Sequence, residues 1–135
     1  MVYLDTNVFI YASVEQSIEK KKTALKIIRS LIEKSELKIS TLVIQEMIFT
    51  LGKLGISSET INSDIKFYLK FLEYEVSADT LRDAIDLSFK VQGFKSINDL
   101  IHLKIAEKFC EKIVSFDRDF AKFKKHCKIP VEILS

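Results

Sequence analysis

The chain has 135 residues, of which 47% are hydrophobic and 30% charged, with three glycines, one proline and a net charge of +2. This composition excludes a disordered or fibrous chain, and a chain of this size is large enough to bury a core, so we expect one domain over residues 1–135. No apolar run approaches the roughly 20 residues that span a bilayer, and the two cysteines form no Cys-x-x-Cys pair, so we expect a cytoplasmic protein with no membrane segment.

Short apolar stretches alternate with helical patterns along the whole chain. Five stretches predict strands, at residues 1–4, 37–40, 73–76, 112–116 and 131–134. Pro130 cannot donate a ladder hydrogen bond, which predicts that the last strand lies at a sheet edge. Because strands and helices alternate, we expect an α/β fold with a central parallel sheet of four to five strands, covered by helices on both faces.

The helices between these strands are predicted from apolar residues at i, i+3 and i+4 spacing. We expect hydroxyl side chains to start several of them: Ser40 or Thr41, Ser57 or Ser58, Ser77, and Ser96. The apolar stripes expected to face the core include Ile44, Met47, Ile48 and Leu51 in one helix, Ile61, Ile65, Tyr68, Leu69 and Leu72 in the next, and Leu81, Ala84, Ile85 and Ser88 in a third.

Four acidic residues stand where a solvent-facing position does not explain them well. Asp5 follows the first strand and Asp117 follows the fourth, and the carboxyl ends of neighbouring parallel strands open into one crevice. Glu46 lies one turn into a helix among apolar-face residues, and Asp99 lies three residues after Ser96. Each also has a structural explanation: a turn or cap for the two strand-end acids, a favourable helix start for Glu46, and a capping box for Asp99.

A cluster of four carboxylates must take up protons or bind a cation, because two unit charges about 4 Å apart repel by roughly 4 kcal/mol at an effective dielectric near 20. Carboxylates without histidine or cysteine select a hard ion, so Mg²⁺ or Mn²⁺ is the expected cofactor. Such an ion activates water and neutralises charge on a phosphate, which indicates phosphodiester hydrolysis.

These residues resemble the motifs of PIN-domain ribonucleases, and the short chain is most similar to VapC-type toxins of toxin–antitoxin pairs. The resemblance rests on Leu4-Asp5-Thr6-Asn7, on Glu46 in the segment 40–46, on Asp99 in Ser96-Ile97-Asn98-Asp99, and on the segment 115–120 around Asp117. It implies a three-layer α/β/α fold in which the first strand lies between the second and the fourth. It also implies a catalytic and metal-binding quartet of Asp5, Glu46, Asp99 and Asp117.

By the same resemblance, Thr6, Asn7 and Ser115 match polar positions that support the acids, and Asp119 belongs to the motif as local structure rather than as a ligand. Membership would further imply Mg²⁺ or Mn²⁺ dependence, cleavage of RNA, frequent homodimers and an antitoxin protein as partner. Lys95, Lys104 and Arg118 are candidates for contacts with RNA phosphates.

Other functions fit the sequence less well. A receiver domain would need a pair of adjacent acids after the first strand, and a dehalogenase-type phosphatase would need an aspartate at position 7, where Asn7 stands. A nucleotide-binding oxidoreductase would need a glycine-rich turn that the first segment lacks. Two alternatives remain open: a non-catalytic PIN-like module that binds RNA or protein, and an RNA-processing PIN nuclease without an antitoxin.

Overall fold

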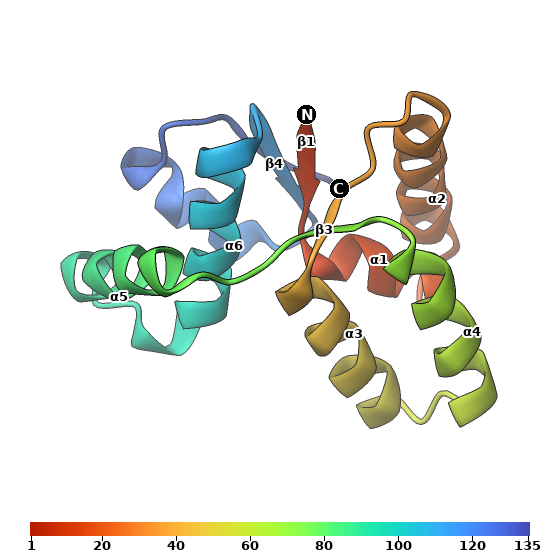
Figure 1. Cartoon of the computed structure of the whole chain (residues 1–135). Helices are drawn as coiled ribbons and strands as arrows, with labels where there is room; N and C mark the ends of the chain where they lie inside the picture. Colours follow the sequence, from red (N-terminus) through yellow and green to blue (C-terminus); the bar gives the residue numbers. More distant parts are fainter.

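Five short strands alternate with helices in the computed structural model, which describes residues 1–135 (Figure 1). The strands are β1 (Val2–Leu4), β2 (Ile39–Ser40), β3 (Leu72–Tyr74), β4 (Lys112–Ser115) and β5 (Val131–Ile133). The α-helices are α1 (Thr6–Ser13), α2 (Ile18–Glu33), α3 (Thr41–Lys53), α4 (Ser58–Leu69), α5 (Ala78–Val91) and α6 (Ile97–Phe109). Two segments form 3-10 helices, η1 (Phe94–Ser96) and η2 (Arg118–His126).

All strand pairs are parallel, but they form two separate ladders. One sheet has three strands in the order β1-β4-β5, and β2 pairs only with β3. The expected sheet of four to five strands is therefore wrong in number, and β1 does not lie between β2 and β4. β2 has only two residues before α3 begins. A side-chain hydrogen bond of 2.8 Å between the Tyr3 hydroxyl and Ser40 Oγ joins β1 to β2 instead.

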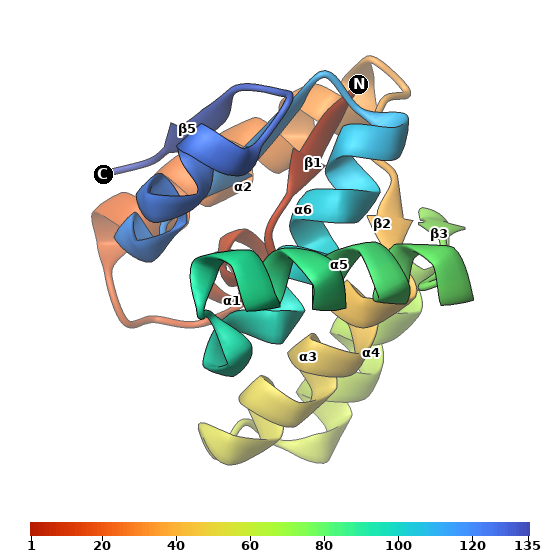
Figure 2. The same ribbon diagram turned by 90° about the vertical axis from the view of Figure 1, so that its left-hand side faces the viewer.

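Helices cover the three-stranded sheet on both faces, which confirms the α/β/α layering (Figure 1). α6 packs on β4 from one side, and α1 packs on β4 from the other, with α2 lying against α1. β5, which follows Pro130, forms the expected edge of the sheet. α3 and α4 pack against each other below this body (Figure 2).

Serine side chains start four of the helices. Ser17, Ser40, Ser57 and Ser77 each accept a hydrogen bond from the backbone N–H three residues later, which satisfies a donor at the start of α2, α3, α4 and α5. The caps predicted at Ser40, Ser57 and Ser77 are confirmed. Ser96 makes no such bond before α6.

All three expected core stripes are wrong in part. In α5 the buried side chains are Thr80, Ala84, Leu87 and Ser88, whereas Leu81 and Ile85 are 40% and 38% exposed. In α3, Ile48 is 48% exposed, and Leu69 and Leu72 at the end of the next stripe are also exposed. Apolar residues occupy more than one face of these helices, so spacing alone does not select the face that meets the core. No helix is both long and apolar enough to cross a membrane.

Candidate active site

Asp5 stands at the carboxyl end of β1 and is bound to the end of β4. Its backbone N–H continues the ladder to Val114 O over 2.9 Å, and its Oδ1 caps α1 by accepting from the Thr6 N–H over 2.8 Å. Its Oδ2 accepts from the Ser115 hydroxyl over 2.8 Å. The carboxylate is thus buried and held by donors from helix α1 and strand β4.

Ser115 and Asn7 connect Asp5 to Asp117. Ser115 Oγ also accepts from the Asn7 amide over 3.1 Å and from the Asp117 N–H over 2.9 Å. Asn7 Oδ1 accepts in turn from the Phe116 N–H over 3.1 Å. Asp117 caps η2 by accepting from the backbone N–H of Asp119, whose own side chain makes no hydrogen bond.

Glu46 comes from α3 and is held by donors from two other helices. Its Oε1 accepts from the Thr6 hydroxyl over 2.7 Å and lies 2.5 Å from His102 Nε2, while its Oε2 accepts from the Asn98 amide over 3.3 Å. Burial raises the pKa of Glu46, but the hydrogen bonds from His102, Thr6 and Asn98 outweigh it, so the net pKa is lowered. Glu46 therefore stays ionised at neutral pH.

Asp99, in the first turn of α6, accepts no hydrogen bond. The Ser96 N–H bonds to Gly93 O, so the capping-box explanation for Asp99 is wrong. Burial raises the pKa of Asp99 to about 7, and the negative charges of Asp5, Asp117 and Glu46 add to the rise against the opposing effect of His102. Burial also raises the pKa of Asp5, against the opposing effects of His102 and of the hydrogen bonds from Ser115 and Thr6.

All four acids line one open cavity of about 330 Å³. They arrive from four places in the sequence: the ends of β1 and β4, helix α3 and helix α6. The remaining lining residues are Thr6, Asn7, Ile10, Tyr11, Gln16, Thr50 and Leu54. Most residues that line the cavity are therefore polar, and within it the charges of Asp5, Asp117 and Glu46 add to the burial that raises the pKa of Asp99.

Comparisons with known proteins identify the family of the chain. The family model described as PIN domain matches residues 2–126. The chain belongs to the PIN domain family. No curated protein sequence matches it significantly.

Solved structures share the PIN fold at low sequence identity. VapBC2 from Rickettsia felis, bound to a DNA fragment from its promoter, is 22% identical over 100% of both chains, with a TM-score of 0.66. VapC20 from Mycobacterium tuberculosis, a sarcin-ricin loop cleaving toxin, is 17% identical over 92% of this chain and 95% of that chain, with a TM-score of 0.68. VapBC-5 from the same organism is 17% identical over 98% and 97% of the two chains, with a TM-score of 0.60.

The donor set of this PIN domain suits a hard divalent cation, because the cavity offers carboxylate oxygens and no sulfur. No three acidic or histidine side chains stand close enough to hold one ion between them. Mg²⁺ is usually held by one or two carboxylates with water completing its shell, so a cage of three protein ligands is not required.

The three basic candidates for RNA contact lie in different surroundings. Arg118 follows Asp117 directly and is exposed, and Lys95 is exposed in η1. Lys104 makes an ion pair with Glu107 over 3.0 Å and lines other hollows, between α5, α6 and η2. Lys20 lies beside the acid cavity, since its Nζ lies 4.8 Å from the ring centroid of Tyr11, a lining residue.

Sequence reasoning missed His102 and Asn98, which hold Glu46. His102 is fully buried in α6 of this PIN domain, among Leu100, Ile101 and Leu103. Burial lowers the pKa of His102, but the hydrogen bond to Glu46 and the charges of Asp5 and Asp99 outweigh this effect and raise it. A histidine inside an apolar helical run needs polar partners, and its position three residues after Asp99 puts both on one helix face.

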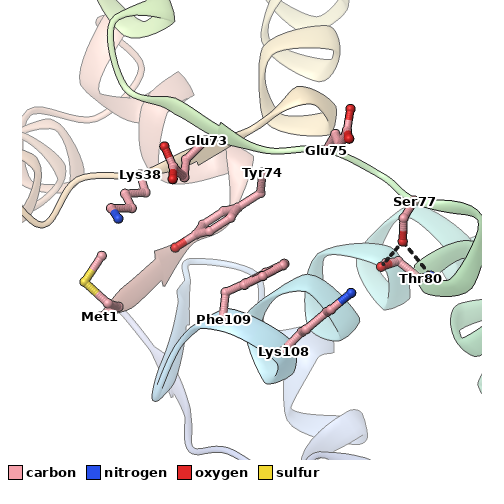
Figure 3. Close-up of a pocket in the computed structure, with 9 residues that line it drawn as sticks. All are labelled: Met1, Lys38, Glu73, Tyr74, Glu75, Ser77, Thr80, Lys108 and Phe109. Carbon is pink, nitrogen blue, oxygen red and sulfur yellow. Dashed lines mark hydrogen bonds between the residues drawn. The ribbon is translucent and has the colours of Figure 1, made fainter.

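A second hollow of about 430 Å³ lies near the starts of β1 and β2, where Met1 and Lys38 face Tyr74 and Phe109 (Figure 3). The Tyr74 and Phe109 rings are stacked with centroids 4.8 Å apart. Its two carboxylates, on Glu73 and Glu75, belong to exposed residues. This hollow therefore lacks the buried acids that distinguish the PIN-domain cavity.

Proposed function

We propose that this PIN domain is a metal-dependent endoribonuclease that hydrolyses phosphodiester bonds of RNA. The observation that carries the proposal is the gathering of Asp5, Glu46, Asp99 and Asp117, from four separate segments, around one open cavity. Burial raises the pKa of Asp99 and the charges of the other three acids add to the rise, which supports a site that binds a cation. These four residues are the proposed catalytic and metal-binding groups, with Mg²⁺ or Mn²⁺ as cofactor.

Each supporting residue has a separate task in this mechanism. Ser115 and the Thr6 N–H hold the two oxygens of Asp5, and the Thr6 hydroxyl orients Glu46. Asp99 accepts no hydrogen bond, so both of its oxygens are available for a ligand. A divalent ion supplies an activated water and neutralises charge on the phosphate. No side chain is required as nucleophile.

Two observations support RNA as the substrate: the exposed basic side chains and the fold shared with VapC20. The cavity is open and the exposed cations Arg118 and Lys95 are suited to phosphate contacts. VapC20, which shares the fold, is described as cleaving the sarcin-ricin loop. A structured RNA loop is therefore the first substrate to test, followed by single-stranded RNA.

A toxin–antitoxin context is the second part of the proposal. VapBC2 and VapBC-5, which share the fold, belong to systems in which toxin and antitoxin occur together. Exposed apolar side chains on α3, α5 and η1 support protein partners; they are Ile48, Phe49, Leu81, Ile85, Phe89 and Phe94. In the view of Figure 2, α5 lies above α3. We propose an antitoxin and a second copy of the chain as the partners.

The test of the nuclease proposal combines metal binding with cleavage. Purified protein is titrated with Mn²⁺ and incubated at pH 7–8 with structured and single-stranded RNAs, with and without a chelator. We expect Mn²⁺ binding and metal-dependent cleavage, both lost in Asp5→Asn and both retained in Asp83→Asn, an exposed acid on α5. Protein that binds no Mn²⁺ and cuts none of these RNAs contradicts the proposal. RNA binding without cleavage would indicate the non-catalytic module instead.

A further inference from the structure

His102 is a fully buried titratable side chain beside the acids that the proposed mechanism leaves without a task. Its Nε2 lies 2.5 Å from Glu46 Oε1, and its Nδ1 lies 2.6 Å from the Tyr3 hydroxyl. The same Nε2 is 3.7 Å from Asp5 Oδ1. The imidazole thus bridges a carboxylate of the cavity and a hydroxyl inside the core.

The chain of hydrogen bonds continues beyond His102 into the backbone. The Tyr3 hydroxyl lies 2.8 Å from Ser40 Oγ, and Ser40 Oγ accepts from the Val43 N–H over 3.2 Å at the start of α3. Tyr3 is 1% exposed and Ser40 is fully buried. This series of hydrogen bonds therefore starts and ends on α3, and its members on β1 and α6 are buried.

When the imidazole is neutral, one donor order uses every hydrogen in this series of hydrogen bonds. Ser40 donates to Tyr3, Tyr3 donates to His102 Nδ1, and the Nε2–H of His102 donates to Glu46. If the imidazole is protonated, both nitrogens donate and the Tyr3 hydroxyl turns towards Ser40. Nε2–H donates to Glu46 in either form, so the contact does not depend on the protonation of His102.

We propose that His102 is a positioning residue, which, together with Tyr3 and Ser40, fixes the Glu46 carboxylate for the metal. The inference rests on the proposed function, since it assigns to Glu46 a ligand's task. His102 and Thr6 both bind Oε1, whereas Oε2 has only the 3.3 Å bond from Asn98. Oε2 is therefore the oxygen left with room for a cation. Groups that orient a ligand in this way typically change metal affinity about 10–100-fold when removed.

A purely structural histidine would behave differently from a positioning one. His102 connects three elements of the core, so its loss lowers stability in either case. Only the positioning role links Tyr3, which touches no carboxylate, to the metal affinity of the cavity. Tyr3→Phe removes one hydroxyl and keeps the ring that stacks on Tyr74.

Tyr74→Phe is the matched control. Tyr74 is also buried, and its hydroxyl contacts Cys110 Sγ over 3.7 Å and no residue of the chain to Glu46. Both variants lose one buried hydroxyl from neighbouring tyrosines. A general effect of loosening the core appears in both, whereas a positioning effect appears in Tyr3→Phe alone.

The experiment measures Mn²⁺ affinity by titration calorimetry, alongside urea unfolding, for the wild type, Tyr3→Phe, Tyr74→Phe and His102→Leu. We expect affinity to fall about tenfold or more in His102→Leu, by a smaller factor in Tyr3→Phe, and not at all in Tyr74→Phe. Wild-type affinity in folded Tyr3→Phe overturns the positioning role, even if His102→Leu fails to fold. A wild type that binds Mn²⁺ while all variants match it contradicts the positioning role alone. A wild type that binds no Mn²⁺ contradicts the proposed function and the positioning role with it.

Discussion

The Ser115 hydroxyl donates a hydrogen bond of 2.8 Å to Asp5 Oδ2, which ties the end of β4 to the end of β1. Both residues are buried, and Ser115 Oγ also accepts from Asn7 and from the Asp117 N–H. One hydroxyl thus serves two of the four acids. The relative position of Asp5 and Asp117 depends on it.

Ser115→Ala should therefore destabilise the protein and weaken the metal site together. It leaves the Asp117 N–H without its acceptor and Asp5 with one hydrogen bond fewer, a loss of about 1–3 kcal/mol. Urea unfolding measures the stability, and Mn²⁺ titration should show affinity lowered about tenfold. Ser63→Ala, an exposed serine of α4, is the control and should change stability by less than about 0.5 kcal/mol. Equal behaviour of the two variants would show that Ser115 supports neither acid.

The pKa of Asp99 predicts how the stability of the metal-free protein changes with pH. Folding raises this pKa from 3.8 to about 7, so the folded state binds the proton more tightly than the unfolded chain. The contribution of Asp99 to stability is therefore greatest below the lower value and falls as pH rises through the interval. The raised pKa of Asp5 acts in the same direction.

Asp99→Asn should remove part of the stability that the metal-free protein loses as pH rises. We expect the metal-free variant to be more stable than the wild type at pH 8, by roughly 1–2 kcal/mol once solvent screening is allowed for, and to gain no stability from Mn²⁺. Thermal unfolding from pH 4 to pH 8, with and without Mn²⁺, measures both effects. Asp83→Asn, at an exposed acid, should follow the wild type. A variant that is less stable than the wild type at pH 8 would contradict the electrostatic origin.

The sequence allows the acids to be predicted because two of them follow buried strands. A parallel sheet brings the carboxyl ends of its strands to one edge, so Asp5 and Asp117 lie together if the first and fourth strands are neighbours. The pairing of β1 with β4 meets that condition. Glu46 lies one turn into α3 and Asp99 lies in the first turn of α6, so both reach the strand ends once these helices are placed. The number of strands in the sheet is less predictable, because a two-residue strand such as β2 has too few residues to show an alternating pattern.

Other features depend on tertiary contacts that no spacing rule encodes. His102 sits among apolar residues of α6, and only the approach of β1 and α3 shows that Tyr3 and Glu46 satisfy its two nitrogens. In α5, Leu81 and Ile85 fit the helical spacing as well as Leu87 does, yet they face outward. An apolar stripe reserved for a partner protein has the same spacing as one buried in the core.

The exposed apolar side chains of α5 predict a contact with a second copy of the chain. Phe89 is 65% exposed and meets Phe94 edge-on with centroids 5.1 Å apart, so it contributes little to the core. If a second copy covers α5, Phe89→Glu should yield monomers while changing the free energy of unfolding of the monomer by less than about 0.5 kcal/mol. Sedimentation measures the mass. Ile18→Glu, at a residue 69% exposed on α2, is the matched change and should leave the dimer intact. A Phe89→Glu protein that remains dimeric would exclude this side of α5 as the interface.

Lys20 predicts where the RNA backbone enters the cavity. Its Nζ lies 4.8 Å from the Tyr11 ring centroid and 5.8 Å from that of Phe116, so aromatic rings hold the cation beside a residue that lines the acid cavity. In an Asp5→Asn background, which keeps the RNA intact, Lys20→Ala should weaken binding uniformly across RNA sequences. The magnitude of the slope of log affinity against log salt concentration should fall by about 1, which corresponds to the loss of one phosphate contact.

The control for Lys20 is Lys26→Ala on the same helix. Lys26 lines a separate shallow hollow with Arg29 and Glu33, and no acid of the proposed site borders it. Both variants lose one positive charge from α2, so a general effect of net charge appears in both. A salt slope that falls only in Lys20→Ala indicates a local phosphate contact beside Tyr11. Equal slopes in both variants and the wild type would show that the backbone of the RNA approaches the acids from another side.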